Sequence, residues 1–266
     1  FPDFTNPEVR EWWSNLFKEL VEDIGVKGVW NDMNEPAVME VPNKTFPMDV
    51  RHDYDGNPCS HRKAHNIYGT QMARATYHGV KRFAYPKRPF VITRSAYAGA
   101  QRYSSSWTGD NVASWEHLWI ANIQMQRMSI SGMGFTGSDI GGFAEQPSGE
   151  LYARWIQLGV FHPFCRTHSS GDHGDQEPWA FDEEVTNIIR KFVNLRYQLL
   201  PYLYTMFWQY IEQGIPMLKP LVYYDQDDIQ THYRNDEFIF GNQILVCPIL
   251  EPNSLGRRMY IPKGEW

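Results

Sequence analysis

The sequence has few of the features that define several protein classes. Its three cysteines, Cys59, Cys165 and Cys247, are too few and too widely spaced for a disulfide framework or a closed zinc site, so we expect free thiols. No apolar run approaches the roughly 20 residues of a membrane-spanning helix, and no charged segment followed by an apolar one opens the chain. The sequence therefore predicts no membrane partner and leaves the localisation open.

Positive charge is not in excess either. The 266 residues include 25 Lys and Arg against 31 Asp and Glu, which gives a formal net charge of −6. A chain with this balance offers no basic field to a phosphate backbone. We therefore expect no nucleic-acid partner, and a neutral substrate fits better.

Hydrophobic residues make up 42% of the chain and aromatic residues 15%, which is enough for a sizeable core. Asn6 followed by Pro7 predicts the start of a helix, with apolar residues at helical spacing up to Leu20. Short apolar runs predict five strands, and helical patterns lie between several of them. The predicted strands are 26–30, 90–93, 104–107, 134–136 and 159–161, and the later helices are 64–84, 115–131, 151–158 and 183–213.

This alternation of strands and helices predicts an α/β fold with a parallel sheet. Each strand is followed at once by a polar or charged residue, and such residues gather at the C-terminal strand ends of a (β/α)8 barrel. Five strands are too few to close a barrel. The sequence thus predicts either an open, doubly wound sheet or, as we favour, the C-terminal part of a TIM barrel whose first strands lie elsewhere.

The long helical pattern ends at Gly214, a typical C-cap, and Pro216 lies just beyond it. Four short strand-like runs follow without helices between them, at 218–224, 237–240, 243–250 and 258–261. We interpret 1–214 as the later part of a barrel and 215–266 as the beginning of an antiparallel β-sandwich domain.

Two aspartates follow strand-like runs that contain tryptophan. Asp32 lies in Trp30-Asn31-Asp32-Met33-Asn34-Glu35-Pro36, and Asp110 lies in Ser106-Trp107-Thr108-Gly109-Asp110-Asn111. Hydrolysis of a glycosidic bond with retention needs one carboxylate as nucleophile and a second as acid and then base, about 5 to 5.5 Å apart. Asp32 and Asp110 are candidates for these roles, and surface or capping aspartates are the alternative on residue type alone.

Both runs resemble motifs of glycoside hydrolase family 31, the α-glucosidase and sucrase-isomaltase family. The first resembles its nucleophile motif and the second its acid/base motif. The resemblance continues in the family's order through 93–95, 137–143 and 161–168, and it covers essentially the whole chain. It implies a fragment that covers the later part of the catalytic barrel and needs the remainder of its own enzyme chain to complete that barrel.

The resemblance implies a role for each candidate residue. Asp32 is expected to form a β-linked glycosyl ester, and Asp110 to protonate the leaving oxygen and then activate water. Arg94 is expected to contact the nucleophile or a sugar hydroxyl, with a structural ion pair as the alternative. An apolar wall of the sugar site is expected from Trp30, Met33, Trp107 and Phe143, with core packing as the alternative. Hydrogen bonds to sugar hydroxyls are expected from Asp139, Arg166 and His168.

The function that the resemblance implies is a retaining, exo-acting α-glucosidase that hydrolyses terminal α-linked glucose from oligosaccharides by double displacement. An α-transglucosylase with the same covalent intermediate stays open, as does a related α-xylosidase or α-galactosidase. From another class, a non-catalytic carbohydrate-binding fragment stays open. No cofactor is implied, because two carboxylates suffice, and the His, Cys and Asp residues within 162–175 match no closed zinc pattern, so we expect no metal.

Overall fold

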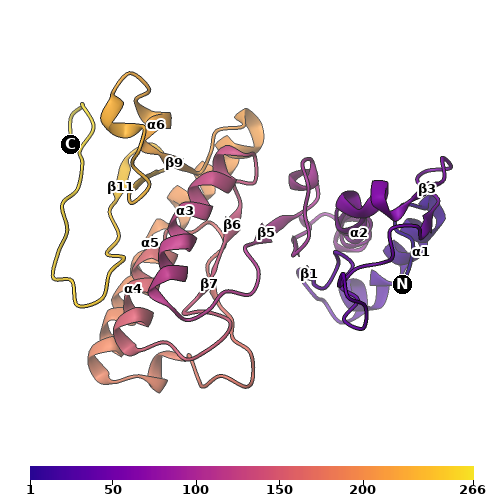
Figure 1. Ribbon diagram of the computed structural model, residues 1–266, viewed down its shortest axis with the longest axis horizontal. Helices are drawn as coiled ribbons and strands as arrows, with labels where there is room; N and C mark the ends of the chain where they lie inside the picture. Colours follow the sequence, from indigo (N-terminus) through magenta and orange to yellow (C-terminus); the bar gives the residue numbers. More distant parts are fainter. The chain divides into compact units, whose positions relative to one another are not determined.

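The computed structural model describes all residues from 1 to 266 (Figure 1). The chain divides into two compact units, Phe1–Trp107 and Thr108–Trp266, and each has buried apolar clusters of its own. None of the helices combines the length and the apolar character that crossing a membrane requires.

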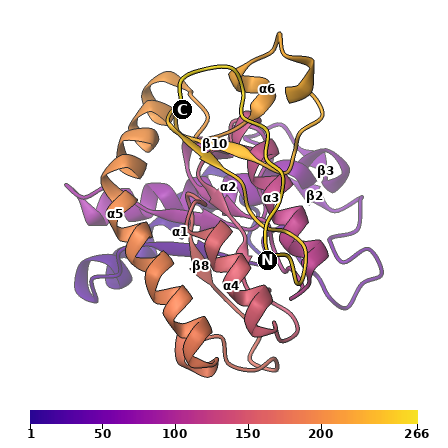
Figure 2. The same cartoon turned by 90° about the vertical axis from the view of Figure 1, so that its left-hand side faces the viewer.

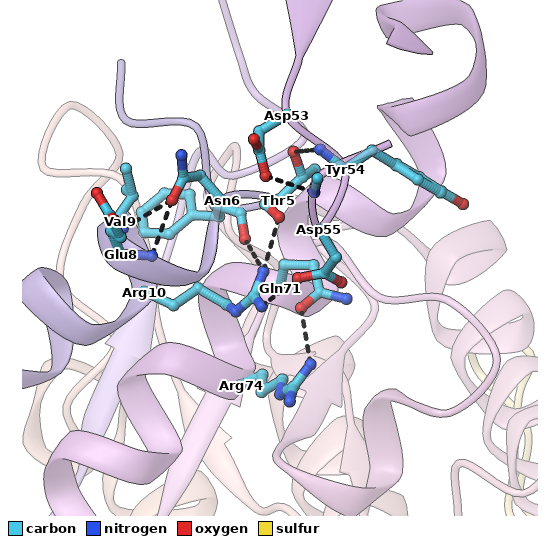
Figure 3. Close-up of polar contacts among 12 residues, drawn as sticks. Thr5, Asn6, Glu8, Val9, Arg10, Asp53, Tyr54, Asp55, Gln71 and Arg74 are labelled. Carbon is cyan, nitrogen blue, oxygen red and sulfur yellow. Dashed lines mark hydrogen bonds and ion pairs between the residues drawn. The ribbon is translucent and has the colours of Figure 1, made fainter. Parts of the chain in front are cut away.

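Unit 1 begins with the helix α1 (Pro7–Asn15). The side chain of Asn6 accepts hydrogen bonds from the backbone N–H groups of Glu8 at 2.8 Å and Val9 at 3.4 Å, which confirms the predicted N-cap (Figure 3). The α-helix does not continue to Leu20 as predicted. It ends at Asn15, and a π-helical turn, η1 (Glu19–Asp23), follows.

The second helix of unit 1, α2 (His61–Ala84), packs along α1. Two side chains of α1 donate hydrogen bonds to α2: Ser14 to the carbonyl oxygen of Ala75 at 2.7 Å, and the Trp13 indole to the Thr76 hydroxyl at 3.0 Å. These bonds fix the register of the two helices. The predicted helix 64–84 is confirmed, with one turn added at its start.

Three strands of unit 1 form a parallel sheet, as predicted. Asn31 lies opposite Thr93, and Thr93 lies opposite Ser106, so the C-terminal ends of the three strands are aligned. A short antiparallel hairpin interrupts the loop between the first two of these strands. The sheet strands are β1 (Val29–Asn31), β4 (Val91–Thr93) and β5 (Ser105–Trp107), and the hairpin strands are β2 (Arg51–His52) and β3 (Cys59–Ser60).

Unit 2 is built around three helices that pack on one another, as Figure 1 shows. Each begins at a residue whose side chain accepts a hydrogen bond from the first turn, namely Ser114, Ser148 and Asp182. Trp155 of the second helix is completely buried in the core between them. The helices are α3 (Trp115–Ile130), α4 (Gly149–Gly159) and α5 (Glu183–Gln213), and all three confirm the predictions to within two residues.

The predicted strand 159–161 is wrong. Helix α4 runs to Gly159 with Val160 as its C-cap, and the strand lies further on, at β8 (Arg166–Thr167). A three-residue apolar run has no periodicity of its own, so it fits the buried end of a helix as well as a strand. The other short strands of this part are β6 (Thr136–Gly137) and β7 (Asp139–Ile140), and β7 pairs with β8 in parallel.

After α5 the chain forms the predicted antiparallel sheet. Gly214 adopts the left-handed conformation with φ of 69° and ends the helix, which confirms the predicted C-cap. Figure 2 shows the sheet beside α3. Its strands are β9 (Leu218–Pro220), β10 (Phe238–Phe240) and β11 (Ile244–Val246).

Three of the strands predicted in this last part differ from the structure. The run 243–250 is a strand only over Ile244–Val246. The run 218–224 is a strand only to Pro220, and α6 (Leu221–Tyr224) then forms one helical turn. The run 258–261 has no regular structure. The boundary after Gly214 stays a prediction. Short 3₁₀ turns complete the structure: η2 (Ala100–Arg102), η3 (Pro178–Ala180) and η4 (Ile229–Thr231).

Candidate active site

The loop after β1 is held by two buried asparagines. Asn31 donates a hydrogen bond from its side chain to Thr76 of α2 at 3.1 Å. Asn34 donates to the Thr93 hydroxyl at 2.8 Å and accepts from the backbone N–H of Ser95 at 3.0 Å. Both amides are only 3% exposed, so these bonds replace water and fix the loop between them. Asp32 lies on this fixed loop, and its side chain is exposed.

Arg94, directly after β4, contacts two carboxylates of that loop. Its Nη1 lies 3.2 Å from Oδ1 of Asp32. Its Nε and Nη2 each donate a hydrogen bond of 2.9 Å to Glu35, one to each carboxylate oxygen. Such a two-point bond fixes the plane of the guanidinium as well as its distance. Arg94 is thus oriented by Glu35 and places its positive charge beside Asp32.

Unit 1 also holds the apolar candidates, and two of them, Trp30 and Met33, are close to Asp32 in the sequence. The rings of Trp30 and Trp107 meet edge to face, with centroids 5.4 Å apart. Trp107 is buried, whereas Trp30 is 42% exposed and Met33 is 38% exposed. Trp107 therefore supports Trp30 from the core side, and Trp30 and Met33 are each partly exposed, with the Met33 sulfur 2.8 Å from Nη2 of Arg94. Their predicted contact with a sugar stays a prediction.

In unit 2, Asp139 and Arg166 are partners in the register of β7 and β8. The Arg166 Nε donates a hydrogen bond of 2.8 Å to Oδ1 of Asp139. Burial raises the pKa of the Asp139 carboxyl, the positive charges of Arg166 and His168 lower it, and the nearby negative charge of Asp110 raises it. The second oxygen of Asp139 is buried without a hydrogen bond, so one acceptor is left for a further donor.

Asn111 connects Asp110 to this pair. Its side chain donates to the backbone oxygen of Asp139 at 2.9 Å and accepts from the N–H of Phe143 at 2.9 Å. The two backbone segments that contain Asn111 and Phe143 lie this close only because residue 142 is glycine. Gly142 has a φ of +93°, and a Cβ atom at this position would lie 2.4 Å from the backbone nitrogen of Ala113. The exposed side chain of Asp110 is therefore held beside the buried Asp139.

His168 follows β8 and packs against Phe143, with ring centroids 5.3 Å apart and planes inclined by 33°. This contact brings together all the predicted site residues of unit 2. Within unit 1 the structure groups the remaining ones around Arg94 and Trp107. The two groups are Asp110, Asp139, Phe143, Arg166 and His168, and Trp30, Asp32, Met33, Arg94 and Trp107.

Sequence reasoning gave no role to Glu35, Asn34 or Asn111, although all three lie inside the two motifs. Their positions beside the candidate carboxylates were the available signal. Their partners, such as Arg94 and Asp139, are remote in sequence, and only the fold identifies them.

The residues considered as zinc ligands lie within 162–175. The chain has no group of three or more His, Cys, Asp or Glu side chains arranged to hold a metal ion. His162 is completely buried, and burial together with the charge of Arg196 lowers its pKa to about 3. It is thus a neutral core histidine at ordinary pH.

Comparison with known proteins identifies the family. The TIM-barrel domain of glycosyl hydrolases family 31 matches residues 1–206, and the C-terminal domain of glycosyl hydrolase family 31 matches residues 214–266. Alpha-glucosidase 2 of Bacillus thermoamyloliquefaciens is 46% identical over the whole chain, which covers 34% of that protein. Neutral alpha-glucosidase AB of Homo sapiens is 40% identical over the whole chain, which covers 28% of it.

A solved structure agrees with these sequences. The ER glucosidase II complex, a catalytic subunit with the binding domain of a regulatory subunit, superposes with a TM-score of 0.93 at 37% identity, over 98% of this chain and 29% of its own. The chain thus spans about a third of the length of these relatives. The predicted fold class, TIM-barrel sequence followed by a C-terminal domain, is confirmed. The chain belongs to glycosyl hydrolase family 31.

Proposed function

We propose that this chain belongs to a retaining, exo-acting α-glucosidase that hydrolyses terminal α-linked glucose from oligosaccharides. The observation that carries the proposal is the 46% identity, over the whole chain, to a protein named as an α-glucosidase. Both candidate carboxylates lie in that matched sequence, each on a loop that buried asparagines hold in place.

The reaction takes two displacements. In the first, a carboxylate oxygen of Asp32 forms a bond to the anomeric carbon as the bond to the leaving oxygen breaks, and Asp110 gives its proton to that oxygen. In the second, Asp110 takes a proton from water, the water oxygen bonds to the anomeric carbon, and the ester to Asp32 breaks. Two inversions leave the released glucose in the α configuration.

Arg94 supports the role of Asp32. Its guanidinium lies beside the carboxylate, so it favours the negative charge that attack requires and the carboxylate that returns when the ester breaks. Glu35 holds the guanidinium through two bonds and keeps it in this place. Arg94 and Glu35 are positioning residues in this proposal.

The substrate contacts follow from the chemistry of the exposed groups. Trp30 and Met33 present apolar faces, on which the C–H faces of a sugar ring stack. Asp139 retains an acceptor oxygen without a partner, and this oxygen suits a sugar hydroxyl. We assign Trp107 and Phe143 to the walls of the site, and Arg166 and His168 to hydrogen bonding with the sugar.

The remainder of the enzyme chain is part of the proposal. The chain covers 28% to 34% of its curated relatives, and its three aligned parallel strands in unit 1 are too few to close a barrel. We therefore expect the isolated 266-residue chain to be inactive and the complete enzyme to be active on the same aryl glucoside. Equal activity of the two would contradict this part of the proposal.

Proton NMR of a nitrophenyl α-glucoside, with and without maltose, tests the activity. A retaining glucosidase releases α-glucose first, and the β anomer appears later by mutarotation. New disaccharide or trisaccharide signals that dominate with maltose would instead identify an α-transglucosylase. If the glucoside is inert but an α-xyloside or α-galactoside is cleaved, the sugar assignment is wrong, and sugar binding without turnover would identify a carbohydrate-binding protein.

A further inference from the structure

A groove with a volume of about 520 Å³ lies between α1 and α2 in unit 1. This volume falls within the range of small-molecule sites, about 300 to 1,000 Å³. Its charged side chains are mostly cationic, although the whole chain carries a formal net charge of −6. The titratable residues of the lining are Arg10, Glu11, Arg74, His78, Lys81 and Arg82.

The basic residues of α2 share one face of the helix. Arg74, His78 and Lys81 are spaced by four and then three residues, and such residues are neighbours on a helix surface. Arg10 and Glu11 lie on α1, on the facing side of the groove. The basic hydrogen-bond donors of α2 therefore lie along one side of the groove, and α1 forms the other side.

Two of its cations are already compensated. Arg10 forms an ion pair with Asp55 and donates hydrogen bonds of 2.9 Å to the carbonyl oxygens of Phe4 and Thr5, and Figure 3 shows its guanidinium near Thr5 and Asp55. Arg82 donates to both carboxylate oxygens of Glu11, at 2.8 and 3.0 Å. The charges of Arg10 and Arg82 are therefore balanced by carboxylates. The other two cations of the groove, Arg74 and Lys81, both lie on α2.

Arg74 and Lys81 have no carboxylate partner. Arg74 bonds the neutral amide of Gln71 at 3.5 Å, as Figure 3 shows, and lies 6.0 Å from the centre of the Tyr103 ring. Lys81 lies 5.7 Å from the centre of the Tyr77 ring. Neither contact neutralises a charge, so two positive charges line the groove without a carboxylate partner of their own, and the one carboxylate of the lining, Glu11, is bonded to Arg82.

His78 lies between these charges. Burial lowers the pKa of the imidazole, and the positive charges of Arg74, Lys81 and Arg82 lower it further, while Glu11 raises it. The rings of Tyr77 and Tyr103 flank it with centroids 5.7 and 6.0 Å away. Burial and these cations thus shift His78 toward its neutral form, and an anion in the groove would oppose the effect of the cations.

We propose that this groove binds the phosphate group of a small phosphorylated compound through Arg74, His78 and Lys81. A phosphate monoester carries about 1.5 to 2 negative charges at pH 7 and three strong acceptor oxygens, which match a guanidinium fork, an ammonium and an imidazole. The groove is wider than one phosphate needs, so it has room for an organic part such as a sugar.

Calorimetric titration of the complete enzyme with inorganic phosphate and with glucose 6-phosphate tests the proposal. We expect both to bind, with weaker binding at high salt. Because bound phosphate favours protonated His78, this imidazole takes up a proton at about pH 6, while phosphate releases a proton as it binds in its dianionic form. The measured heat therefore depends on the ionisation heat of the buffer, and the dependence differs between the parent and a variant without the imidazole. Tighter binding of glucose 6-phosphate would identify a phosphorylated sugar or similar compound as the ligand, and equal affinities would identify free phosphate.

Four variants separate the site from a general charge effect. Arg74→Gln and Lys81→Gln should each weaken phosphate binding about tenfold, because each loses a charge-assisted bond. His78→Gln should remove the proton uptake by the imidazole and leave only the proton release by phosphate. Lys87→Gln, an exposed lysine outside the groove, makes the same charge change as Lys81→Gln and should alter affinity less than about twofold. No phosphate binding by the parent enzyme, or equal losses from Lys81→Gln and Lys87→Gln, would overturn the proposal.

Discussion

The Nη1 atom of Arg94 lies 3.2 Å from the Oδ1 atom of Asp32, although the two residues are 62 positions apart in the sequence. The contact arises because β1 and β4 are parallel neighbours, so that the residues just after Asn31 and Thr93 emerge at the same edge. The backbone N–H of Arg94 also donates to the carbonyl oxygen of Asn31 at 3.0 Å. The hydrogen bonds between the two strands therefore bring the Asp32 carboxylate and the Arg94 guanidinium together.

Replacing Arg94 by Gln should lower kcat by roughly 10² to 10³, the usual cost of removing one preorganised charge partner. The change leaves two carboxylates, Asp32 and Glu35, without the cation that now lies between them. Steady-state kinetics on a nitrophenyl α-glucoside measures the loss. Arg62→Gln, an exposed residue of α2 with no ion pair, serves as control and should retain full activity.

Glu35→Gln should lower kcat less than Arg94→Gln does, by about tenfold, because the amide keeps one acceptor for the guanidinium and loses the charge-assisted pair. If Glu35 acts by orienting Arg94, the two changes are not additive. The double variant should then be no slower than Arg94→Gln alone. Additive losses in this double-mutant cycle would show that Glu35 has a separate role.

The helices of unit 2 could be predicted closely because their end signals are local. The side chain of Asp182 accepts a hydrogen bond from the N–H of Val185, and Gly214 adopts the left-handed conformation. The residues next to each end of α5 therefore determine where the helix begins and ends. The end of α4 has no such signal. The apolar residues at 159–161 fit a helix terminus or a strand equally well, and tertiary packing decides between them.

The candidate site also has a part that could be predicted from local sequence and a part that depends on the fold. The two aspartates could be found because each lies in a motif next to a tryptophan. The bonds that hold their loops could not, because Asn34 bonds Thr93 and Asn111 bonds Asp139 across the fold. The burial of Asp139 beside an exposed Asp110 likewise depends on the pairing of β7 with β8.

Asp32→Ala should abolish hydrolysis of a nitrophenyl α-glucoside, and azide should restore turnover. The small anion fits the space left by the carboxylate, its nitrogen bonds to the anomeric carbon, and nitrophenolate leaves, so the product is the β-glucosyl azide. Product NMR identifies the anomer. Asp49→Ala, at an exposed position, should behave as the parent. Unchanged hydrolysis by Asp32→Ala would show that Asp32 is not the nucleophile.

Asp110→Ala should affect substrates according to their leaving groups. Maltose needs a proton on the departing sugar oxygen, so its hydrolysis should fall by about 10² to 10⁴. A dinitrophenolate leaves without protonation, so the first displacement on that glucoside should change little and the glycosyl enzyme should accumulate. Rapid-quench kinetics with both substrates measures the contrast. Equal losses on both would mean that Asp110 is not the general acid.

His162 predicts a pH dependence of stability. Its pKa is lowered to about 3 in the folded protein from the ordinary 6.5, so between these values the unfolded chain binds a proton that the folded core excludes. The free energy of unfolding should therefore fall as the pH drops from 6.5, by up to about 1.4 kcal/mol per pH unit. Urea unfolding at several pH values measures the slope.

The matched variants separate this group from the other titrating residues. His162→Gln should flatten the pH slope, because glutamine does not titrate, even though its amide in the buried site will lower stability at every pH. His232→Gln, an exposed histidine in the same unit, should leave the slope unchanged. A slope that is the same in the parent and in His162→Gln would show that the folded core admits the proton, and that the ring nitrogens of His162 find a partner when charged.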